Sequence, residues 1–381
     1  MKTPIRLLLV TKSTGGVATY IRALVGGLDK SRFAITVACL SENGPEFAAE
    51  LTQRWGVQAF SLAMERYKIN PLTDARVLFQ LAGRIRREKY DIIHAHASKP
   101  GFLARMAAIG TGIPVVYSPH NFAFHEGSKK LPALVFALLE KIAAPFTAKI
   151  VAVARHERDL ALKYGVGSPD LYTVIHTGID AAPFRAAFDV PKLKASLGVP
   201  AESQVVGAVG RLAIPKLPLD FVRAADEIHK SDPSIRFVWA GAGPLEAEAK
   251  ALTSSLGLDG VFHWLGHRSD VSALYHIFDC FVLPSQWEAY PYVVLEAFAA
   301  GVPVVATSNL GALEIIEDEV NGILVPVNDA PALAVAVKSA LGDPLRINSL
   351  RAAASKQIDE IYTMQNMLRA LEEVYLRARG G

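Results

Sequence analysis

Short apolar, β-branched runs alternate with longer amphipathic runs along this chain. A short apolar run between turn residues predicts a buried strand, and apolar residues spaced three and four apart predict a helix. In the first half, the predicted strands are residues 5–10, 34–40, 91–95, 115–118, 149–154 and 171–175. The predicted helices between them are residues 16–28, 45–55, 74–88, 100–109, 131–144 and 155–164. This alternation predicts βαβ units and a parallel sheet covered by helices.

The alternation pauses at residues 180–200, which contain several prolines and no strand pattern. We interpret this stretch as the connection between two domains. The pattern then resumes with predicted strands at residues 204–209, 235–240, 261–265, 280–283, 303–306 and 323–325. We therefore expect an α/β protein with two doubly wound parallel-sheet domains, residues 1–182 and 183–360.

The segment 361–381 follows the second predicted sheet. Its apolar residues fall on one helical face: Ile361, Met364, Leu368, Leu371 and Tyr375. This spacing predicts a helix. Since the second sheet is complete by then, we expect the helix to cross back onto the first domain.

Composition agrees with a protein of two packed domains. The chain has 381 residues, of which 51% are hydrophobic and 20% charged. The formal net charge is only +3, and no basic tract is interleaved with aromatic residues, so nucleic-acid binding is not indicated. Cys39 and Cys280 lie in predicted strands, which favours buried thiols in a reducing compartment.

Two apolar stretches, 5–10 and 131–139, could be considered as a signal peptide or a membrane span, but both are too short. The run at 5–10 is too short for a signal peptide, and a first strand is the better interpretation. The run at 131–139 is well short of the roughly 20 residues of a membrane span. We expect a cytoplasmic protein that is soluble or lies on a membrane surface.

The segment 285–301 places two carboxylates after a predicted strand. Glu288 lies in the loop, Pro291 is well placed to open a helix, and Glu296 lies within that helix. Ligands of parallel sheets bind at this edge, and a helix N-terminus adds N–H donors. Carboxylate acceptors beside N–H donors suit the hydroxyl groups of a sugar. The alternative is that both glutamates are solvated surface residues.

Cations and glycines follow other strands of the second half. Arg211 and Lys216 come after the strand at 204–209 and suit a phosphate group, although such a loop can also be merely solvated. The next two predicted strands are followed by Gly241 and Gly243, and by His267 and Arg268. These residues could allow close approach of a nucleoside, or form only turns.

In the first half, Gly15 and Gly16 follow the first strand without the dinucleotide-binding spacing, so they form a ligand loop or a tight turn. His94, His96 and His120 follow or end later strands. A metal site is disfavoured because no carboxylate accompanies them at short spacing. A neutral imidazole that donates a hydrogen bond to substrate suits His120, and a structural role is open for His94.

Together these pieces resemble glycosyltransferase family 4, the retaining enzymes of GT-B fold, over nearly the whole chain. Glu288 and Glu296 match the E-x7-E motif of that family. The other matching pieces are Gly15-Gly16, residues 94–101, Ser118-Pro119-His120, residues 176–180, Gly210-Arg211 with Lys216, residues 241–244 and Pro284-Ser285. Members with a similar histidine region often build bacterial surface polysaccharides on lipid carriers.

The resemblance implies a role for each motif residue. Arg211 and Lys216 would hold the donor diphosphate, Glu296 the ribose, and Glu288 the transferred sugar. His120 would face the reacting sugar. Further donor contacts would come from Gly15, Gly16, Gly241, Gly243, His267, Arg268, Ala289, Tyr290, Pro291 and Tyr292. The acceptor would meet His96, Lys99 and Asn121. No metal or other cofactor is expected.

The sequence departs from the family pattern at a few positions. Ala289 stands where the family usually has Gly, and Leu217-Pro218 follows Lys216 in place of Gly. His176-Thr177 and Ala154-Arg155 are also unusual. None of these changes removes a proposed charged ligand, but they leave the identity of the donor open.

We therefore expect a transferase that moves a sugar from a UDP-sugar, or next a GDP-sugar, to a glycan or lipid-linked acceptor. A sugar-nucleotide epimerase-like enzyme and a non-catalytic nucleotide-sugar-binding protein are the alternatives. Lys129, Lys130 and the apolar run 131–139 could contact an anionic membrane on its inner face, as could the basic residues Arg84, Arg86, Arg87 and Lys89. The alternative is an ordinary core helix with solvated lysines.

Overall fold

The computed structural model describes residues 3–65, 70–125 and 127–380. Its contacts divide the chain into two units. Unit 1 comprises Met1–Thr177 with Met364–Gly381, and unit 2 comprises Gly178–Thr363. Residues 1 and 381, the ends of the predicted domains, lie outside the described residues.

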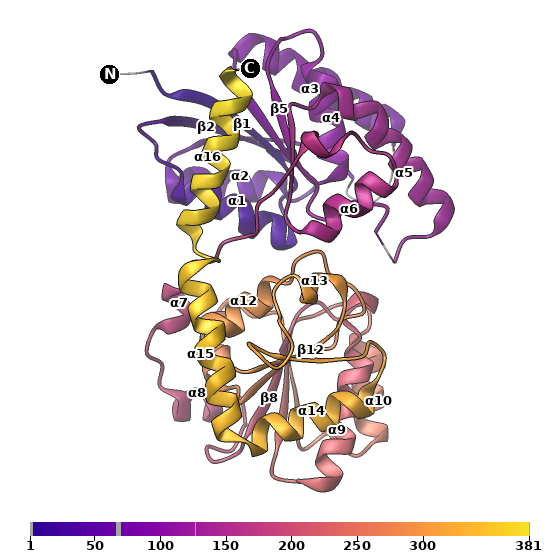
Figure 1. The fold of residues 1–381 in the computed structure, drawn as a ribbon, viewed down its shortest axis with the longest axis vertical. Helices are drawn as coiled ribbons and strands as arrows, with labels where there is room; N and C mark the ends of the chain where they lie inside the picture. The colour runs from indigo at the N-terminus through magenta and orange to yellow at the C-terminus, as the bar shows by residue number, and fades with distance from the viewer. Residues whose placement is uncertain (1–2, 66–69, 126, 381) are drawn as a thin grey trace. The chain divides into compact units, whose positions relative to one another are not determined.

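Unit 1 contains a parallel sheet (Figure 1). Its strand order is β3-β2-β1-β4-β5-β6-β7. Its strands are β1 (Ile5–Thr11), β2 (Phe33–Leu40), β3 (Gln58–Leu62), β4 (Ile92–His96), β5 (Val115–Ser118), β6 (Lys149–Ala152) and β7 (Tyr172–Val174). The predicted strands are confirmed within a few residues at their ends. Strand β3 was not predicted, because it lies at the sheet edge and none of its residues is fully buried.

The helices of unit 1 agree with the predicted helical segments. They are α1 (Gly15–Gly27), α2 (Gly44–Trp55), α3 (Pro71–Glu88), α4 (Ser98–Ala108), α5 (Lys130–Ala143), α6 (Arg155–Lys163) and α16 (Met364–Gly380). Helix α3 begins before the predicted start. Pro71 occupies its first position, and the Asn70 side chain accepts a hydrogen bond from the Thr73 N–H at 3.3 Å.

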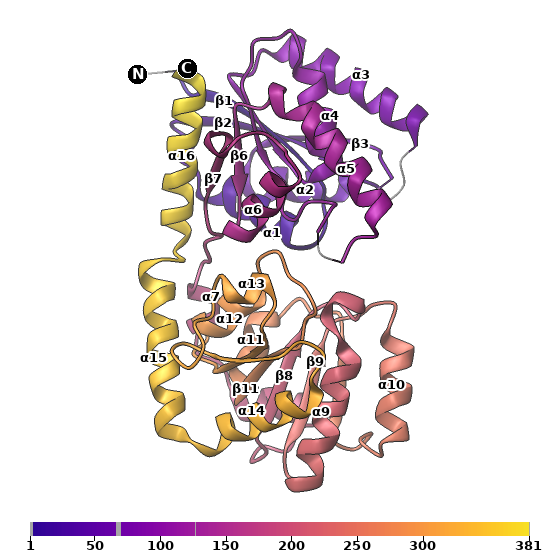
Figure 2. The same ribbon diagram turned by 45° about the vertical axis from the view of Figure 1, so that its right-hand side comes forward.

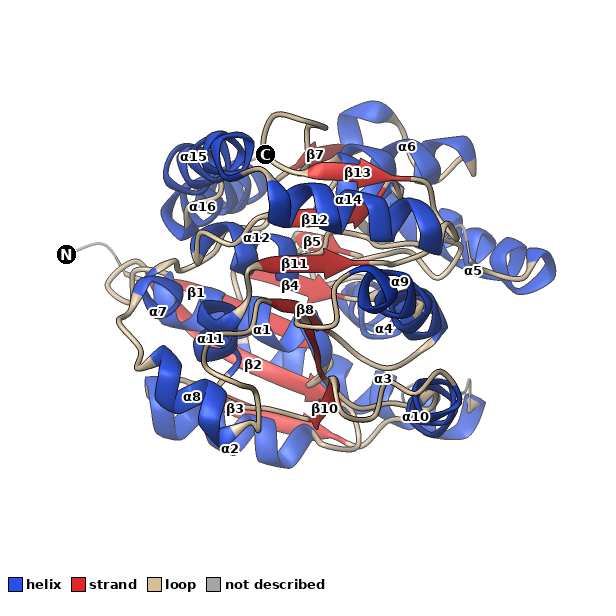
Figure 3. Cartoon of the chain, turned by 90° about the horizontal axis from the view of Figure 1, so that it is seen from below, coloured by secondary structure: helices blue, strands red, loops and turns tan. Residues whose placement is uncertain are grey.

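Helices cover both faces of the unit 1 sheet (Figure 3). Leu8 and Val10 of β1 belong to one core, and Leu7 and Leu9 belong to the other. This alternation follows from the two-residue period of a strand and explains why β1 is apolar almost throughout.

Helix α16 packs against unit 1 (Figure 2). Leu371 and Tyr375 are completely buried in the same core as Leu7. A Cβ atom at Gly27 of α1 would lie 2.4 Å from Leu368, so the two helices approach closely. Ile361 precedes the helix and is 48% exposed, so it is not part of the buried face.

Unit 2 contains a second parallel sheet, with the order β10-β9-β8-β11-β12-β13. Its strands are β8 (Val205–Val209), β9 (Arg236–Ala240), β10 (Phe262–Gly266), β11 (Cys280–Leu283), β12 (Val304–Thr307) and β13 (Ile323–Val325). Its helices are α7 (Ala182–Arg185), α8 (Val190–Ser196), α9 (Pro218–Ser231), α10 (Glu246–Ser255), α11 (Val271–Leu274), α12 (Tyr292–Ala299), α13 (Leu310–Leu313), α14 (Ala330–Gly342) and α15 (Pro344–Glu360). The stretch 180–200 thus contains two short helices, α7 and α8, which belong to unit 2.

In each sheet the chain order reverses at one position. The reversal lies between β1 and β4 in unit 1 and between β8 and β11 in unit 2. Open α/β sheets bind ligands at the carboxyl ends of the strands beside such a switch point. The loop with Gly15 and Gly16 follows β1, and His96 is the last residue of β4. The loops with Lys216 and Glu288 follow β8 and β11.

Candidate active site

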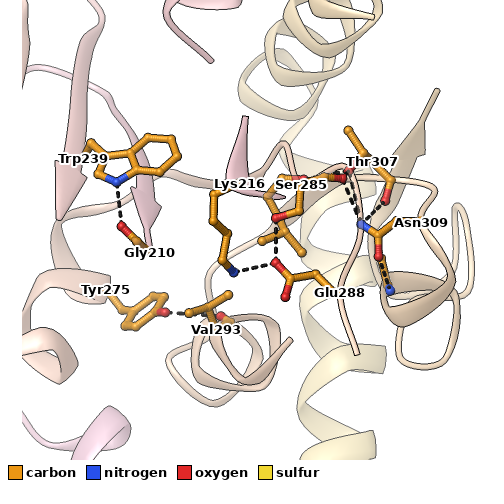
Figure 4. Close-up of polar contacts among 11 residues, drawn as sticks. Gly210, Lys216, Trp239, Tyr275, Ser285, Glu288, Val293, Thr307 and Asn309 are labelled. Carbon is orange, nitrogen blue, oxygen red and sulfur yellow. Dashed lines mark hydrogen bonds and ion pairs between the residues drawn. The ribbon is translucent and has the colours of Figure 1, made fainter. Parts of the chain in front are cut away.

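In unit 2, the two predicted site loops are joined by an ion pair. Lys216 Nζ lies 2.5 Å from Glu288 Oε1, and both side chains are mostly buried (Figure 4). The Ser285 hydroxyl donates to the same carboxylate oxygen at 2.7 Å. A backbone hydrogen bond from Gln286 N–H to Pro215 O, 2.8 Å long, also connects the loops. The pair therefore places one cation and one carboxylate together at the switch point.

A polar network from β12 and the loop after it supports the Glu288 loop (Figure 4). The Ser285 carbonyl accepts hydrogen bonds from Thr307 Oγ1 at 2.5 Å and Asn309 Nδ2 at 3.1 Å. The Asn309 side-chain oxygen in turn caps α13 by accepting from the Ala312 N–H. Sequence reasoning missed Thr307 and Asn309, although their position directly after a predicted strand was a usable signal.

Gly311 packs directly against Glu288. A Cβ atom at position 311 would lie 2.5 Å from the Glu288 carbonyl oxygen and 2.7 Å from its Cβ. Real Cβ atoms do not approach that closely, so only glycine fits there without moving the loop. Position 311 was not among the predicted site residues.

Glu296 lies in α12 and is partly buried. Its Oε2 accepts a hydrogen bond from the Tyr275 hydroxyl at 2.7 Å, and that hydroxyl also approaches the Val293 carbonyl at 3.2 Å. Burial holds the pKa of Glu296 above its usual value. The Tyr275 hydrogen bond and the charge of Lys216 oppose this shift in part. Tyr275 thus orients Glu296, the residue predicted to bind the ribose. Tyr275 itself was not predicted.

The predicted helix start at Pro291 is close to the observed one. Pro291 is the N-cap of α12, which begins at Tyr292. Ala289 is partly exposed in the loop, whereas the Tyr290 side chain is buried beside Tyr362. Tyr292 is partly exposed. The N-terminus of α12 therefore begins four residues after Glu288, at the end of the same loop.

The glycine turns after β9 pack against the loop that follows β8. A Cβ atom at Gly241 would lie 1.9 Å from the Gly210 carbonyl oxygen, and one at Gly243 would lie 2.3 Å from the Leu212 carbonyl oxygen. Trp239 Nε1 donates to the Gly210 carbonyl at 2.8 Å (Figure 4). These glycines are therefore required by the close approach of two loops, whether or not they also face a nucleoside.

The remaining predicted donor cations differ in their surroundings. Arg211 is exposed and has no ion pair with any residue that the structure describes. Arg268 forms two hydrogen bonds with Asp270, at 2.8 and 2.6 Å, and His267 is exposed. Arg211 is thus available for a diphosphate, whereas Arg268 is shared with a carboxylate that the sequence reasoning did not include.

In unit 1, Gly15 and Gly16 form the first turn of α1 directly behind β1. Both are exposed, and a Cβ atom at either would meet nothing within 4 Å. Gly15 has a φ of 65°, which favours glycine. The first turn of α1 therefore has open space beside Gly15 and Gly16, which an anion or an acceptor hydroxyl would need in order to reach the backbone N–H groups there.

His96 and His120 are hydrogen-bonded to each other. His96 Nδ1 lies 3.0 Å from His120 Nε2, and the Tyr20 ring packs on both. Burial lowers the pKa of His96 well below its usual value. Burial and the charge of Lys12 together lower the pKa of His120 to about 3. Both rings are therefore neutral at physiological pH.

His94 has a structural environment. Its Nδ1 is 2.6 Å from the Tyr375 hydroxyl of α16, and its Nε2 is 2.9 Å from Ser118 Oγ. Within the described part of the chain, no group of three or more His, Cys, Asp and Glu side chains could hold a metal ion.

The backbone around His120 has an unusual conformation. His120 and Asn121 have φ angles of 51° and 87°, in the left-handed region. The Asn121 N–H donates to Glu157 Oε1 at 2.5 Å, and the Val153 N–H donates to Glu157 Oε2 at 2.9 Å. Burial raises the pKa of Glu157 to about 7. Glu157, which the sequence analysis missed, therefore fixes the turn that presents His120.

Lys99, predicted on the acceptor side, lies in the first turn of α4. Its Nζ is 2.8 Å from Asp74 Oδ1 and 3.0 Å from the Glu65 carbonyl. These contacts tie α4 to α3. Any contact with an acceptor would have to compete with them.

Two family models together match most of the chain. Residues 14–182 match Glycosyltransferase Family 4, and residues 189–359 match Glycosyl transferases group 1. The chain is also 33% identical over 309 residues to UDP-Gal:alpha-D-GlcNAc-diphosphoundecaprenol alpha-1,3-galactosyltransferase of Escherichia coli, covering 79% of this chain and 78% of that protein. The chain belongs to glycosyltransferase family 4. It is a glycosyltransferase, and family membership favours transfer over the epimerase and binding-protein alternatives.

Other relatives agree with this assignment. The putative glycosyltransferase EpsD of Bacillus subtilis is 29% identical over 320 residues, covering 80% of this glycosyltransferase and 83% of EpsD. Among solved structures, HepE of Anabaena in complex with UDP and glucose has a TM-score of 0.84 at 21% identity, covering 98% and 100% of the two chains. WaaG, a glycosyltransferase of lipopolysaccharide biosynthesis, has a TM-score of 0.77 at 16% identity, covering 97% and 99%. These likenesses confirm the predicted GT-B fold class.

No helix in the described ranges is both long enough and apolar enough to cross a bilayer.

Proposed function

We propose that this glycosyltransferase moves a sugar from a UDP-sugar, ahead of a GDP-sugar, to a lipid-linked or glycan acceptor during synthesis of a surface polysaccharide or related glycoconjugate. The donor is supported by the name of the Escherichia coli relative and by the UDP complex of HepE. The lipid-linked acceptor is supported by the same relative, whose name gives a diphosphoundecaprenol substrate. Such an enzyme would work in the cytoplasm, at the inner face of the membrane.

The observation that carries this proposal is the Lys216–Glu288 pair at the switch point of the unit 2 sheet. Lys216 and the exposed Arg211 would bind the donor diphosphate. Glu288 and the N–H groups at the start of α12 would bind hydroxyls of the transferred sugar. Glu296, oriented by Tyr275, would bind the ribose.

The proposed reaction is metal-independent and retains the anomeric configuration. The bond between sugar C1 and the donor phosphate oxygen breaks, and a bond from C1 to the acceptor oxygen forms on the same face. The acceptor proton passes to the leaving diphosphate. Arg211 and Lys216 would stabilise the negative charge that develops there. His120, neutral because its pKa is about 3, would face the sugar as a hydrogen-bonding group.

A thermal-shift screen with UDP, GDP, ADP and TDP and their sugars, with and without EDTA, tests the donor. A ligand that binds only the folded state raises the melting temperature. We expect a shift with UDP that EDTA does not change. A shift only with another nucleotide would overturn the donor assignment, and a shift lost in EDTA would overturn metal independence.

Variants test the assigned roles. Glu288→Ala should reduce turnover of the sugar donor more than binding of bare UDP, whereas Glu296→Ala should weaken UDP binding as well. Glu248→Ala, an exposed glutamate of α10, is the matched control. Wild-type UDP affinity and turnover in both site variants would contradict the assignment. NMR of the product's anomeric configuration, with UDP release only in the presence of acceptor, tests retention and transfer.

A further inference from the structure

Helix α5 lies on the outside of unit 1 (Figures 1 and 3), and most of its large apolar side chains are exposed. Leu131 is 74% exposed, Leu134 59% and Leu138 57%. The other members of this exposed row are Val135, Ile142 and Phe146. Their spacing of three and four residues places them on one helical face that continues past the end of the helix.

The inward face of α5 carries mostly small side chains, with Phe136 packed partly buried against the core. Ala133, Ala137 and Ala143 are buried there, together with Glu140. A helix on a water-facing surface normally buries its large apolar residues and exposes its charges. Helix α5 thus packs on the unit 1 core mainly through small residues and leaves most of its large apolar residues on the opposite face.

A buried ion pair fixes this orientation. Glu140 Oε2 accepts from Arg105 Nη2 at 2.7 Å, and Glu140 Oε1 accepts from the Tyr117 hydroxyl at 2.8 Å. Arg105 is completely buried in α4. Rotating α5 to bury its leucines would leave Arg105 as an unpaired buried charge, which is strongly unfavourable. Exposure of the apolar face is thus specified by the fold.

Positive charges border the apolar face. Lys129 and Lys130 are exposed at the start of α5, and Lys141 is exposed near its end. Glu140 is the one acidic residue between Gly127 and His156, and it is buried. We call these three lysines and the six exposed apolar residues the α5 surface. The predicted basic run on α3 is separate, and its Arg84 is paired with Glu88.

We propose that the α5 surface is where this protein lies on an anionic lipid bilayer. An apolar helical face bordered by lysines, with the one acidic residue of the helix buried, is the pattern of an interfacial helix. The apolar side of such a helix enters the boundary of the acyl chains, and its lysines meet anionic headgroups. The inference rests on the proposed function for its biological purpose, because a lipid-linked acceptor would be reached from such a surface. The charge pattern favours anionic lipid over a neutral apolar partner.

Flotation of the full chain with phosphatidylcholine vesicles that contain about 30% phosphatidylglycerol, an anionic lipid, tests the proposal. We expect binding to these vesicles and at least ~10-fold weaker binding to pure phosphatidylcholine. Leu134→Gln/Leu138→Gln should reduce the bound fraction at least ~10-fold, and Lys129→Gln/Lys130→Gln should abolish the preference for anionic lipid. Val335→Gln/Leu345→Gln, which changes exposed apolar residues of α14 and α15, is the matched control and should bind like wild type.

Three outcomes would overturn the proposal. They are no flotation of the wild type, equal flotation of the Leu134/Leu138 variant, and a concentration-dependent dimer by light scattering that this variant abolishes. The last would mean that a second copy covers the α5 surface. The vesicles contain neither donor nor acceptor, and UDP binding is measured separately by thermal shift. Failure of membrane binding is therefore distinguishable from failure of the proposed function.

Discussion

Lys216 and Glu288 neutralise each other across two loops of unit 2, with 2.5 Å between Nζ and Oε1. The resemblance to family 4 assigned them to different parts of the donor, the diphosphate and the sugar. The structure makes them one electrostatic unit. Removing Lys216 therefore also leaves a carboxylate charge without its cation beside the proposed diphosphate site.

This coupling predicts non-additive variants. Lys216→Ala should weaken UDP binding and cost at least ~2 kcal/mol in transition-state stabilisation. Adding Glu288→Gln should restore UDP affinity about 5-fold over Lys216→Ala alone, because the repulsive carboxylate is gone. Titration calorimetry with UDP measures this, and Lys230→Ala, which removes a paired surface lysine of α9, should match wild type. Strictly additive affinities would contradict the coupling.

Gly311→Ala should impair catalysis through the Glu288 loop. The new Cβ would lie 2.5 Å from the Glu288 carbonyl oxygen, so the loop must shift. Misplacement of a positioning group by about 1 Å costs roughly 100-fold in rate. We expect about 10- to 100-fold lower turnover in steady-state assays and about 1–3 kcal/mol lower stability from overpacking.

Gly83→Ala is the control for this substitution. Gly83 is exposed within α3, with nothing within 4 Å of its Cβ position. Alanine there should leave turnover unchanged and raise stability by about 0.5–1 kcal/mol, because glycine is unfavourable inside a helix. Wild-type turnover of Gly311→Ala would show that the loop tolerates the shift.

Glu157 should make stability fall as pH rises towards neutrality. Its pKa is raised from 4.5 in the unfolded chain to about 7 in the folded protein. Its contribution to stability is therefore complete below pH 4.5 and is lost as pH rises through about 7. The loss amounts to about 3 kcal/mol. Urea unfolding at a series of pH values should show this slope in wild type and a flatter one in Glu157→Gln.

Glu50 provides a control of opposite sign. The Arg22 side chain lowers the pKa of Glu50, so its contribution is present above the unfolded pKa and is lost only as pH falls below it. Glu50→Gln should leave the slope between pH 5 and 7 unchanged. Equal slopes in wild type and Glu157→Gln would contradict the raised pKa of Glu157.

The His96–His120 contact predicts a tautomer. His96 Nε2 is buried and has no hydrogen-bond partner among the residues described. A buried N–H without an acceptor is costlier than an unused lone pair, so the His96 proton should reside on Nδ1 and be donated to His120 Nε2. His120 would then carry its own proton on Nδ1. Long-range ¹⁵N–¹H NMR of histidine-labelled protein distinguishes the tautomers.

His96→Ala should release this constraint and shift the ring signals of His120. Tyr375→Phe, which removes a partner of His94 only, should not. A proton on Nε2 of His120 in the wild type would contradict the assignment. The rings of His94, His96 and His120 should also remain neutral from pH 5 to 8, because burial lowers all three pKa values.

The sequence predicted elements and motif positions well because both depend on local pattern. The strand at 280–283 has its predicted ends, since a fully buried parallel strand is a continuous apolar run. The placement of Lys216 and Glu288 after strands was also predicted. Their ion pair was not, because it depends on which strands are neighbours.

Supporting residues were harder to predict for the same reason. Thr307 and Asn309 act on the Ser285 carbonyl from another strand, and Glu157 acts on Asn121 from α6. Their sequence context resembles that of any loop or helix. The orientation of α5 could not be predicted either. A sequence of apolar residues with one glutamate does not show that Glu140, and not the leucines, faces the core.

The packing of α16 reverses the order in which the units can finish folding during synthesis. Leu371 and Tyr375 complete a core that also contains Leu7 and Leu9. The ribosome makes all of unit 2 before it makes these partners. Domains generally fold as they emerge, N-terminal ones first. Here unit 1 emerges first with an open core, whereas unit 2 can close earlier. A nascent chain ending near residue 363 should therefore expose apolar surface that chaperones recognise.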